Sequence, residues 1–216
     1  MAIGRSAGKD QKKSPRSVPT RTTPKALATR EALISLAAEM FAKRGYLQTS
    51  IRDIAREASM TTGAIYGHFR NKAELLTEAI SSRTESDLES IPETQVGPPQ
   101  HVWVLHEAAL RYRERRELRS LILQGAAAAV TDDETRDRLR DEQLAHLQRW
   151  IDGYEANRIQ LGIDDAVNIR DAVLFSWAAE VGLGVLESLG IEPKSKKTWA
   201  DLYSRVGRSL ALPAEE

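Results

Sequence analysis

Apolar residues recur every three or four positions along most of the chain from Lys25 onward, and no convincing alternation at a period of two interrupts them. This spacing is typical of amphipathic helices and predicts an all-α protein. The first helix is expected within TREALISLAAEMFAKRGY, residues 29–46, because its apolar residues fall on one face and Gly45 stands where a helix C-terminus is expected. That face consists of Ile34, Ala37, Ala38 and Phe41.

Two short helices are predicted in the stretch TSIRDIAREASMTTGAIYGHF, residues 49–69, and they differ in how much they can bury. The first has a capping hydroxyl at its start and a full apolar stripe. This stripe consists of Ile51, Ile54, Ala55 and Ala58. After the interruption at ASM, Thr61 offers a new N-cap, but the helix of about two turns that follows has only Ile65 and Phe69 to turn inward. The second helix is therefore expected to face something outside the protein.

A boundary between this head and a larger helical body is predicted in SIPETQVGPPQ, residues 90–100, where three prolines and a glycine cannot continue a helix. A fourth helix, which carries Leu75, Leu76 and Ile80, precedes the boundary. The body is expected to begin with two helices within residues 101–130 that bend near Arg116. Thr131 and Glu134 then predict a capping box that opens the next helix.

The last two predicted helices differ in their pattern. Residues 167–189 are apolar on nearly every side and predict a helix that is buried all round. The final helix has a stripe on a single face, formed by Trp199, Leu202, Tyr203, Val206 and Leu210. About nine helices are expected in total.

Composition restricts the chemistry. The 216 residues are 41% hydrophobic and 29% charged, as in ordinary soluble domains, and the absence of cysteine excludes disulfides, thiolate zinc sites and cysteine nucleophiles. No apolar run approaches twenty residues, so a cytoplasmic location is expected. Recognised metal-ligand spacings, phosphate-binding glycine loops and nucleophile elbows are missing, so neither an enzyme nor a metal or other cofactor is predicted.

The net charge of zero hides an asymmetry. Residues 1–30 carry eight basic side chains and one acidic, which leaves 23 basic and 30 acidic for the remainder. Residues 1–24 are therefore interpreted as a disordered basic arm, either solubilising or tracking a polyanion. Because residues 31–89 hold seven basic and nine acidic side chains, the arm becomes more important if the head binds DNA.

Two short helices joined by a three-residue turn, the second with a thin buried stripe, form the helix-turn-helix arrangement that sets a recognition helix into the DNA major groove. The stretch TSIRDIAREASMTTGAIYGHFRNKAELL, preceded by MFAKRGY, resembles the DNA-binding head of the tetracycline-repressor (TetR) family of bacterial transcriptional regulators. The resemblance covers roughly residues 28–80, where the family's phenylalanines, glycine, tyrosine and lysine fall in register. Beyond residue 90 it lies in the helix pattern only.

The resemblance implies a set of phosphate contacts on double-stranded DNA. Thr49 and Ser50 match positions that bind a phosphate through hydroxyl and backbone amide at a helix N-terminus. Tyr66, His68 and Lys72 match further phosphate-contacting positions. In an isolated helix Tyr66 and His68 would be ordinary surface residues, but in register with the rest of the motif they favour DNA.

The resemblance assigns the reading of bases to the recognition helix. Thr61 and Thr62 open this helix, and Thr62 and Ala64 are expected to point toward base edges, where a hydroxyl can donate or accept and a methyl group can meet a thymine methyl. Gly63 is expected to let the backbone come close to DNA.

Two positions of the head depart from the family pattern. Ser59 stands where the turn usually has glycine, so a left-handed backbone there would carry strain of roughly 1–2 kcal/mol unless the turn is of another type. Gly67, still expected at the DNA interface, replaces a histidine or tyrosine and removes one contact. The operator preference of relatives cannot be transferred to this chain.

The resemblance also implies an effector pocket among the body helices. The residues predicted to line it carry few charges and suit a mostly apolar effector, although core packing explains any single one of them at least as well. They are Trp103, His106, Leu147, Tyr154, Phe175 and Trp177. Glu180, inside the apolar LFSWAAEVGLGV, is expected to be paired, hydrogen-bonded or at a wet rim, and is interpreted as an interface or boundary residue in preference to one that orients a ligand.

The resemblance also implies how the protein dimerises, because the last two predicted helices look like the pair with which this family forms a dimeric four-helix bundle. The predicted homodimer interface includes Val173, Gly184, Trp199, Tyr203 and Val206. A two-fold dimer would place two recognition helices about one DNA turn, roughly 34–36 Å, apart on a palindromic operator.

The leading hypothesis is a homodimeric, ligand-responsive transcriptional repressor with a basic arm (1–24), a helix-turn-helix head (25–89) and a helical ligand-binding and dimerisation domain (90–216). Two alternatives stay open. One is a sequence-tolerant architectural DNA binder that relies on the basic arm. The other is a binding protein for apolar metabolites whose head is vestigial.

Overall fold

The computed structural model describes residues 23–89, 105–106 and 108–209, which form helices joined by turns and contain no β-strand, so the all-α prediction is confirmed. No helix in this part of the chain has the length and apolarity needed to cross a lipid bilayer. The helices are α1 (Pro24–Arg44), α2 (Ile51–Glu57), α3 (Thr62–Tyr66), α4 (Lys72–Glu89), α6 (Arg116–Ala129), α7 (Asp133–Ala156), α8 (Arg158–Leu161), α9 (Ile169–Ser188) and α10 (Lys196–Arg208).

Two predicted segments lie outside the described residues. These are the boundary at 90–100 and the basic arm, apart from the arm's last two residues. Those two start α1. The hydroxyl of Thr23 accepts the N–H of Ala26 at 3.3 Å, and Pro24 takes a first-turn position where its missing N–H costs nothing. The helix ends where predicted, because Gly45 adopts a φ of 88° that favours glycine.

The short helices α2 and α3 are each capped by a hydroxyl. Ser50 accepts the N–H of Asp53 at 3.1 Å, while the carboxylate of Asp53 accepts the N–H of Ser50 at 3.0 Å, so the two form a capping box. Thr61 accepts the N–H of Ala64 at 3.1 Å at the start of α3. Between the helices Ser59 has a φ of 54°, so the turn keeps a left-handed residue although glycine is absent.

The fourth helix joins the head to the body. α1 packs along α4, and Arg30 of α1 binds Glu78 of α4 through two hydrogen bonds of 2.6 and 3.1 Å. The guanidinium of Arg30 also lies 4.8 Å from the centre of the Phe69 ring. Farther along, α4 packs against α6 and α7. One core cluster therefore runs without a break from α1 to Leu121 of α6 and Leu139 of α7.

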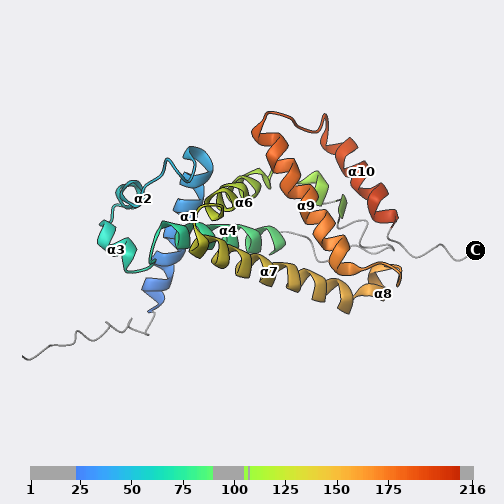
Figure 1. Ribbon diagram of the computed structural model, residues 1–216, viewed down its shortest axis with the longest axis horizontal. Helices are drawn as coiled ribbons and strands as arrows, with labels where there is room; N and C mark the ends of the chain where they lie inside the picture. The colour runs from blue at the N-terminus through green and yellow to red at the C-terminus, as the bar shows by residue number, and fades with distance from the viewer. Residues whose placement is uncertain (1–22, 90–104, 107, 210–216) are drawn as a thin grey trace, which may run out of the picture.

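Figure 1 shows the head, with α2 and α3, at one end of the molecule and α8 to α10 at the other, with α4, α6 and α7 running between them. In the body α6, α7 and α9 pack against one another. A second, smaller core cluster near α8 consists of Leu147, Ile151, Ile163 and Ile169. Each end of the molecule thus has its own packed centre.

Two expectations for the body are not met within the single chain. The helix predicted to be buried all round, α9, leaves one apolar face exposed, because no other described helix covers that side. This face includes Leu174, Phe175, Val185, Leu186 and Leu189. The predicted capping box before α7 does not form either. The hydroxyl of Thr131 instead donates to the carbonyl of Ala128 at the end of α6, and Asp132 takes the N-cap position without a side-chain capping bond.

Candidate functional site

Helix α3 presents most of its surface outward. Of its five residues only Ile65 is buried, and Tyr66 is 56% exposed. The other residues assigned to DNA on this helix and just beyond it are exposed or half-buried, namely Thr61, Thr62, Gly63, Ala64, Gly67 and His68. The structure therefore brings these predicted residues together on one accessible face, anchored from behind by Ile65 and the buried Phe69.

The start of α2 differs from what the resemblance implied. Thr49 is only 1% exposed, and its hydroxyl donates to the carbonyl of Gly45 at 2.9 Å, so it closes the loop instead of facing solvent. Ser50 is exposed, but the carboxylate of Asp53 accepts both its N–H and its hydroxyl. These hydrogen bonds from Ser50 hold the pKa of Asp53 below its ordinary value. A carboxylate thus occupies the donors that a phosphate was expected to meet.

Lys72 makes contacts within the protein that its position in the motif did not predict. Its ammonium donates to the carbonyl of Tyr46 at 2.9 Å and to that of Thr49 at 3.2 Å, and it lies 4.0 Å from the centre of the Tyr46 ring. Burial lowers its pKa. Lys72 therefore fastens the loop between α1 and α2 to the start of α4, and at most one of its three N–H donors is left for a phosphate.

A cavity of about 180 Å³ lies in the body between α4, α6, α7, α9 and α10. Of the six residues predicted to line a pocket, Leu147, Tyr154 and Trp177 do so. Phe175 does not, because it points from the opposite face of α9 and is 62% exposed. His106 lies outside the lining, and Trp103 lies outside the described residues.

Most of the cavity wall is apolar and comes from α6, α7 and α9. Its apolar members are Leu105, Ala108, Leu118, Ile122, Leu147, Trp150, Ile163, Val167, Ile169, Ala172, Val173, Trp177 and Val181. The side chain of Tyr154 is half-buried, and burial raises its pKa to about 12. Spacing alone missed Trp150, because on α7 its position cannot be told from that of a core residue.

One part of the wall is charged and internally paired. Arg119, only 3% exposed, binds Glu180 at 3.0 Å and Glu187 at 2.7 and 2.9 Å, and also donates to the carbonyl of Tyr112. Arg115 lies 3.5 Å from the other oxygen of Glu180. The prediction that Glu180 is paired is confirmed, while its assignment to an interface places it incorrectly, because it faces this cavity.

The residues predicted for a dimer interface fall into two groups. Val173 and Tyr203 line the cavity, and Gly184 packs inside the chain, where an added Cβ would meet the Cβ of Arg119 at 3.1 Å. Trp199 is half-buried with its ring centre 5.1 Å from that of Tyr203. Val206 is 37% exposed and lies on the outside. Val173, Tyr203 and Gly184 therefore make their contacts within the chain.

Together the features define a helix-turn-helix protein whose reading head is joined by α4 to a helical body that encloses a cavity. Residues 33–79 match the family model described as bacterial regulatory proteins, tetR family. A Pseudomonas putida protein described as the probable HTH-type transcriptional regulator ArpR is 31% identical over 201 residues, which cover 89% of this chain and 85% of that protein. The chain belongs to the TetR family of bacterial transcriptional regulators.

Two further comparisons agree with this assignment. The HTH-type transcriptional repressor KstR2 of Mycolicibacterium smegmatis is 29% identical over 126 residues, and the match spans 57% of this chain but only 62% of KstR2. The structure of Salmonella enterica GusR superimposes with a TM-score of 0.69 over 88% of this chain and 99% of GusR, at 20% identity. At that identity the likeness supports the fold alone.

Proposed function

We propose that the protein is a homodimeric repressor that binds a palindromic operator through α3 and leaves it when a small, mostly apolar molecule occupies the body cavity. The observation that carries the proposal is the path of α4. Its first turn receives the Lys72 contacts that hold the α1–α2 loop, and its later residue Thr84 lines the cavity. A molecule in the cavity and the reading head therefore act on the same rigid helix.

The release mechanism requires only a difference in affinity. A ligand that binds the DNA-free arrangement better than the DNA-bound one shifts the population toward the former. A tenfold loss of operator affinity needs about 1.4 kcal/mol of such differential binding. Because α4 packs on α1 in the head and on α6 and α7 in the body, a change of its angle would reach α3 through α1 and α2.

The division between reading and positioning is testable on DNA. Selection of bound fragments from a random pool, followed by binding titrations over a range of salt, measures base preference and salt slope separately. We expect Thr62→Ala to change the preferred bases, and Lys72→Met to weaken every sequence alike. Equal loss of preference in both variants would contradict the assignment.

The exposed apolar face of α9 and the outward side of α10, with Leu202 and Val206, support the proposed dimer. We expect Val206→Glu to give monomers in equilibrium sedimentation and to abolish operator binding. Ile159→Glu is the matched control, because Ile159 is 90% exposed on α8, which is not one of the two helices assigned to the interface. A Val206→Glu monomer that still binds operator tightly would refute the dimer.

A further inference from the structure

The polar groups in the cavity wall differ in whether the protein itself satisfies them. The hydroxyls of Thr84 and Ser176 donate to carbonyls of their own helices at 2.9 and 3.0 Å. His146 contacts Ser81 through one ring nitrogen and Arg149 through the other. These groups have no need of a ligand.

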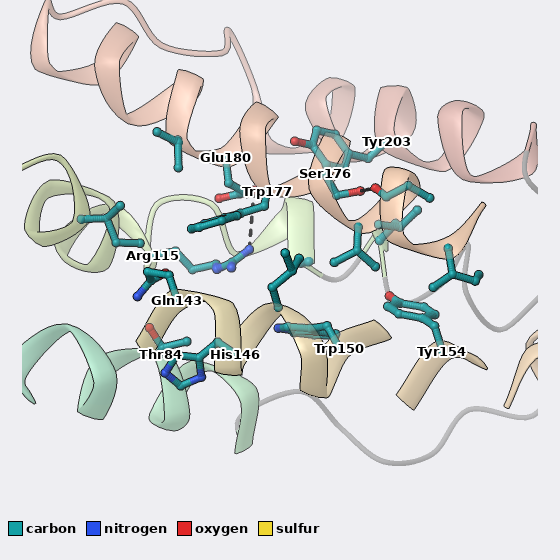
Figure 2. Close-up of a pocket in the computed structure, with 18 of the residues that line it drawn as sticks. Thr84, Arg115, Gln143, His146, Trp150, Tyr154, Ser176, Trp177, Glu180 and Tyr203 are labelled. Atoms are coloured by element: carbon teal, nitrogen blue, oxygen red, sulfur yellow. Dashed lines mark hydrogen bonds and ion pairs between the residues drawn. The ribbon is translucent and has the colours of Figure 1, made fainter. Parts of the chain in front are cut away.

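Among the buried polar atoms of the wall without a hydrogen-bond partner in the described part of the chain are Nε2 of Gln143, the hydroxyl of Tyr203 and Oε1 of Glu180. Among the described residues, this oxygen of Glu180 has only the ion pair with Arg115 at 3.5 Å. Figure 2 shows that Glu180 and Tyr203 enter the cavity from the helices on one side, while Gln143 comes from α7 on the other. A buried donor or acceptor without a partner costs about 1–3 kcal/mol, so a molecule that satisfies these atoms gains on binding.

The protonation states decide which polar group fits. The amide of Gln143 is a donor, and the phenol of Tyr203 keeps its proton because burial, with Glu180 nearby, raises its pKa to about 12. Glu180 is an acceptor. These three groups therefore present two donors and one acceptor, and a hydroxyl group offers the complement, two lone pairs and one O–H.

Charge balance argues against an anionic ligand. The two guanidinium groups of Arg115 and Arg119 are offset by the carboxylates of Glu180 and Glu187, which bind them. A carboxylate beside Glu180 would add a negative charge without a new cation to pair it, which is costly in a buried site. A neutral head group carries no such penalty.

We propose, resting on the function proposed above, that the effector is a neutral apolar molecule whose single hydroxyl binds Gln143, Tyr203 and Glu180. Its apolar part lies toward Trp150 and Tyr154, which Figure 2 shows across the cavity from Tyr203 and farther along it than Gln143 and Glu180. The volume of about 180 Å³ suits one ring with a short substituent, since an engineered apolar cavity of about 150 Å³ binds benzene.

Three probes with the same apolar part test the head group by isothermal titration calorimetry of the full chain without DNA. They are 4-propylphenol, propylbenzene and 4-propylbenzoate. We expect the phenol to bind about tenfold or more tightly than either of the others. Tightest binding by the benzoate, or no measurable binding by any of the three, would overturn the inference.

Variants of the cavity wall then test whether its side chains cause the tighter binding of the phenol. Gln143→Leu and Tyr203→Phe should each bring the phenol close to propylbenzene in affinity, while the affinity for propylbenzene itself stays unchanged. Gln148→Leu is the matched control, because Gln148 is exposed on the same helix and donates to Asp152 at 2.7 Å. A preference that survives in both cavity variants contradicts the inference, and circular dichroism shows whether each variant folds.

Operator release is measured separately, by displacement of labelled operator DNA. A phenol preference without release of DNA would contradict the proposed function and leave the head-group assignment standing. Release of DNA by all three probes, bound with equal affinity, would contradict the head-group assignment and leave the proposed function standing.

Discussion

The side-chain amide of Gln124 on α6 bridges two backbone groups of the head. Its oxygen accepts the N–H of Tyr46, and its nitrogen donates to the carbonyl of Phe41 at 3.2 Å. Tyr46 in turn offers its carbonyl to Lys72. Because Ile122, two residues earlier on α6, lines the cavity, this helix joins the cavity wall directly to the loop that precedes α2.

Replacing Gln124 by leucine should weaken this junction. Gln124→Leu leaves the Tyr46 N–H without its acceptor, while the Phe41 carbonyl keeps the N–H of Gly45 at 2.9 Å, so we expect the free energy of unfolding to fall by about 1–3 kcal/mol. Urea denaturation measures the change, and Gln148→Leu should stay within about 0.5 kcal/mol of the parent. A Gln124→Leu variant as stable as its control would show that the bridge contributes nothing.

Two glycines on the body helices should respond in opposite directions to alanine. At Gly125 an added Cβ would lie 2.8 Å from Cδ1 of Ile80 and 3.1 Å from Cδ2 of Leu139, so Gly125→Ala should destabilise the protein by about 1–2 kcal/mol. At Gly153 on α7 nothing lies within 4 Å, and alanine should stabilise by up to about 1 kcal/mol. Thermal unfolding of both variants checks the signs, and equal shifts would contradict the tight crossing of α4, α6 and α7.

The left-handed backbone at Ser59 is expected to be slightly strained. Ser59→Gly is expected to raise the free energy of unfolding by about 0.5–1 kcal/mol, since glycine adopts a φ of 54° without steric cost. Ser59→Val, with a branched Cβ, should lower it by about 1–2 kcal/mol. Chemical denaturation of the pair is the measurement, and a valine variant as stable as the glycine one would show that the turn readily changes type.

His146 should make stability depend on pH in the acidic range. Burial, and then the charge of Arg149, lower its pKa below the ordinary value of 6.5, although Glu85 and Glu142 oppose the shift. The unfolded chain takes up a proton as the pH falls through about 6.5 while the folded protein does not, so this contribution is present above that pH and is lost below it. The loss of stability is complete once the pH has fallen below the pKa of His146 in the folded protein.

Unfolding free energies between pH 7.5 and 5 test this dependence. We expect His146→Gln to flatten the profile in this window relative to the parent protein. An identical slope in both proteins would mean that other groups cause it.

The sequence predicted the head more fully than the body, and the difference has a physical cause. In the head, caps and turns are local, so Gly45 and Thr61 mark helix ends from a few neighbouring residues. In α9, apolar residues on the exposed face look the same as those that line the cavity, so periodicity predicted burial for both. Contacts such as that of Lys72 with Tyr46 join distant segments, and no spacing rule indicates them.

The roles of single site residues were also hard to predict, because they depend on packing and on contacts between distant segments. Phe175 and Trp177 are two residues apart, yet a helix turns them to different faces, and only packing shows which face is inside. Thr49 was assigned to DNA from its motif position, but the carbonyl of Gly45 takes its hydroxyl. Gln143 carries no motif, and only its burial without a partner points to a ligand.

In the proposed dimer, the bare apolar face of α9 would tie operator occupancy to the amount of protein. If only the dimer binds, then below the dimer dissociation constant the concentration of binding-competent protein rises with the square of the chain concentration. A twofold fall in protein then lowers the dimer about fourfold, so operators are vacated more steeply than simple dilution would suggest. Leu186, Leu189 and their neighbours on that face would thus set the protein level at which repression begins.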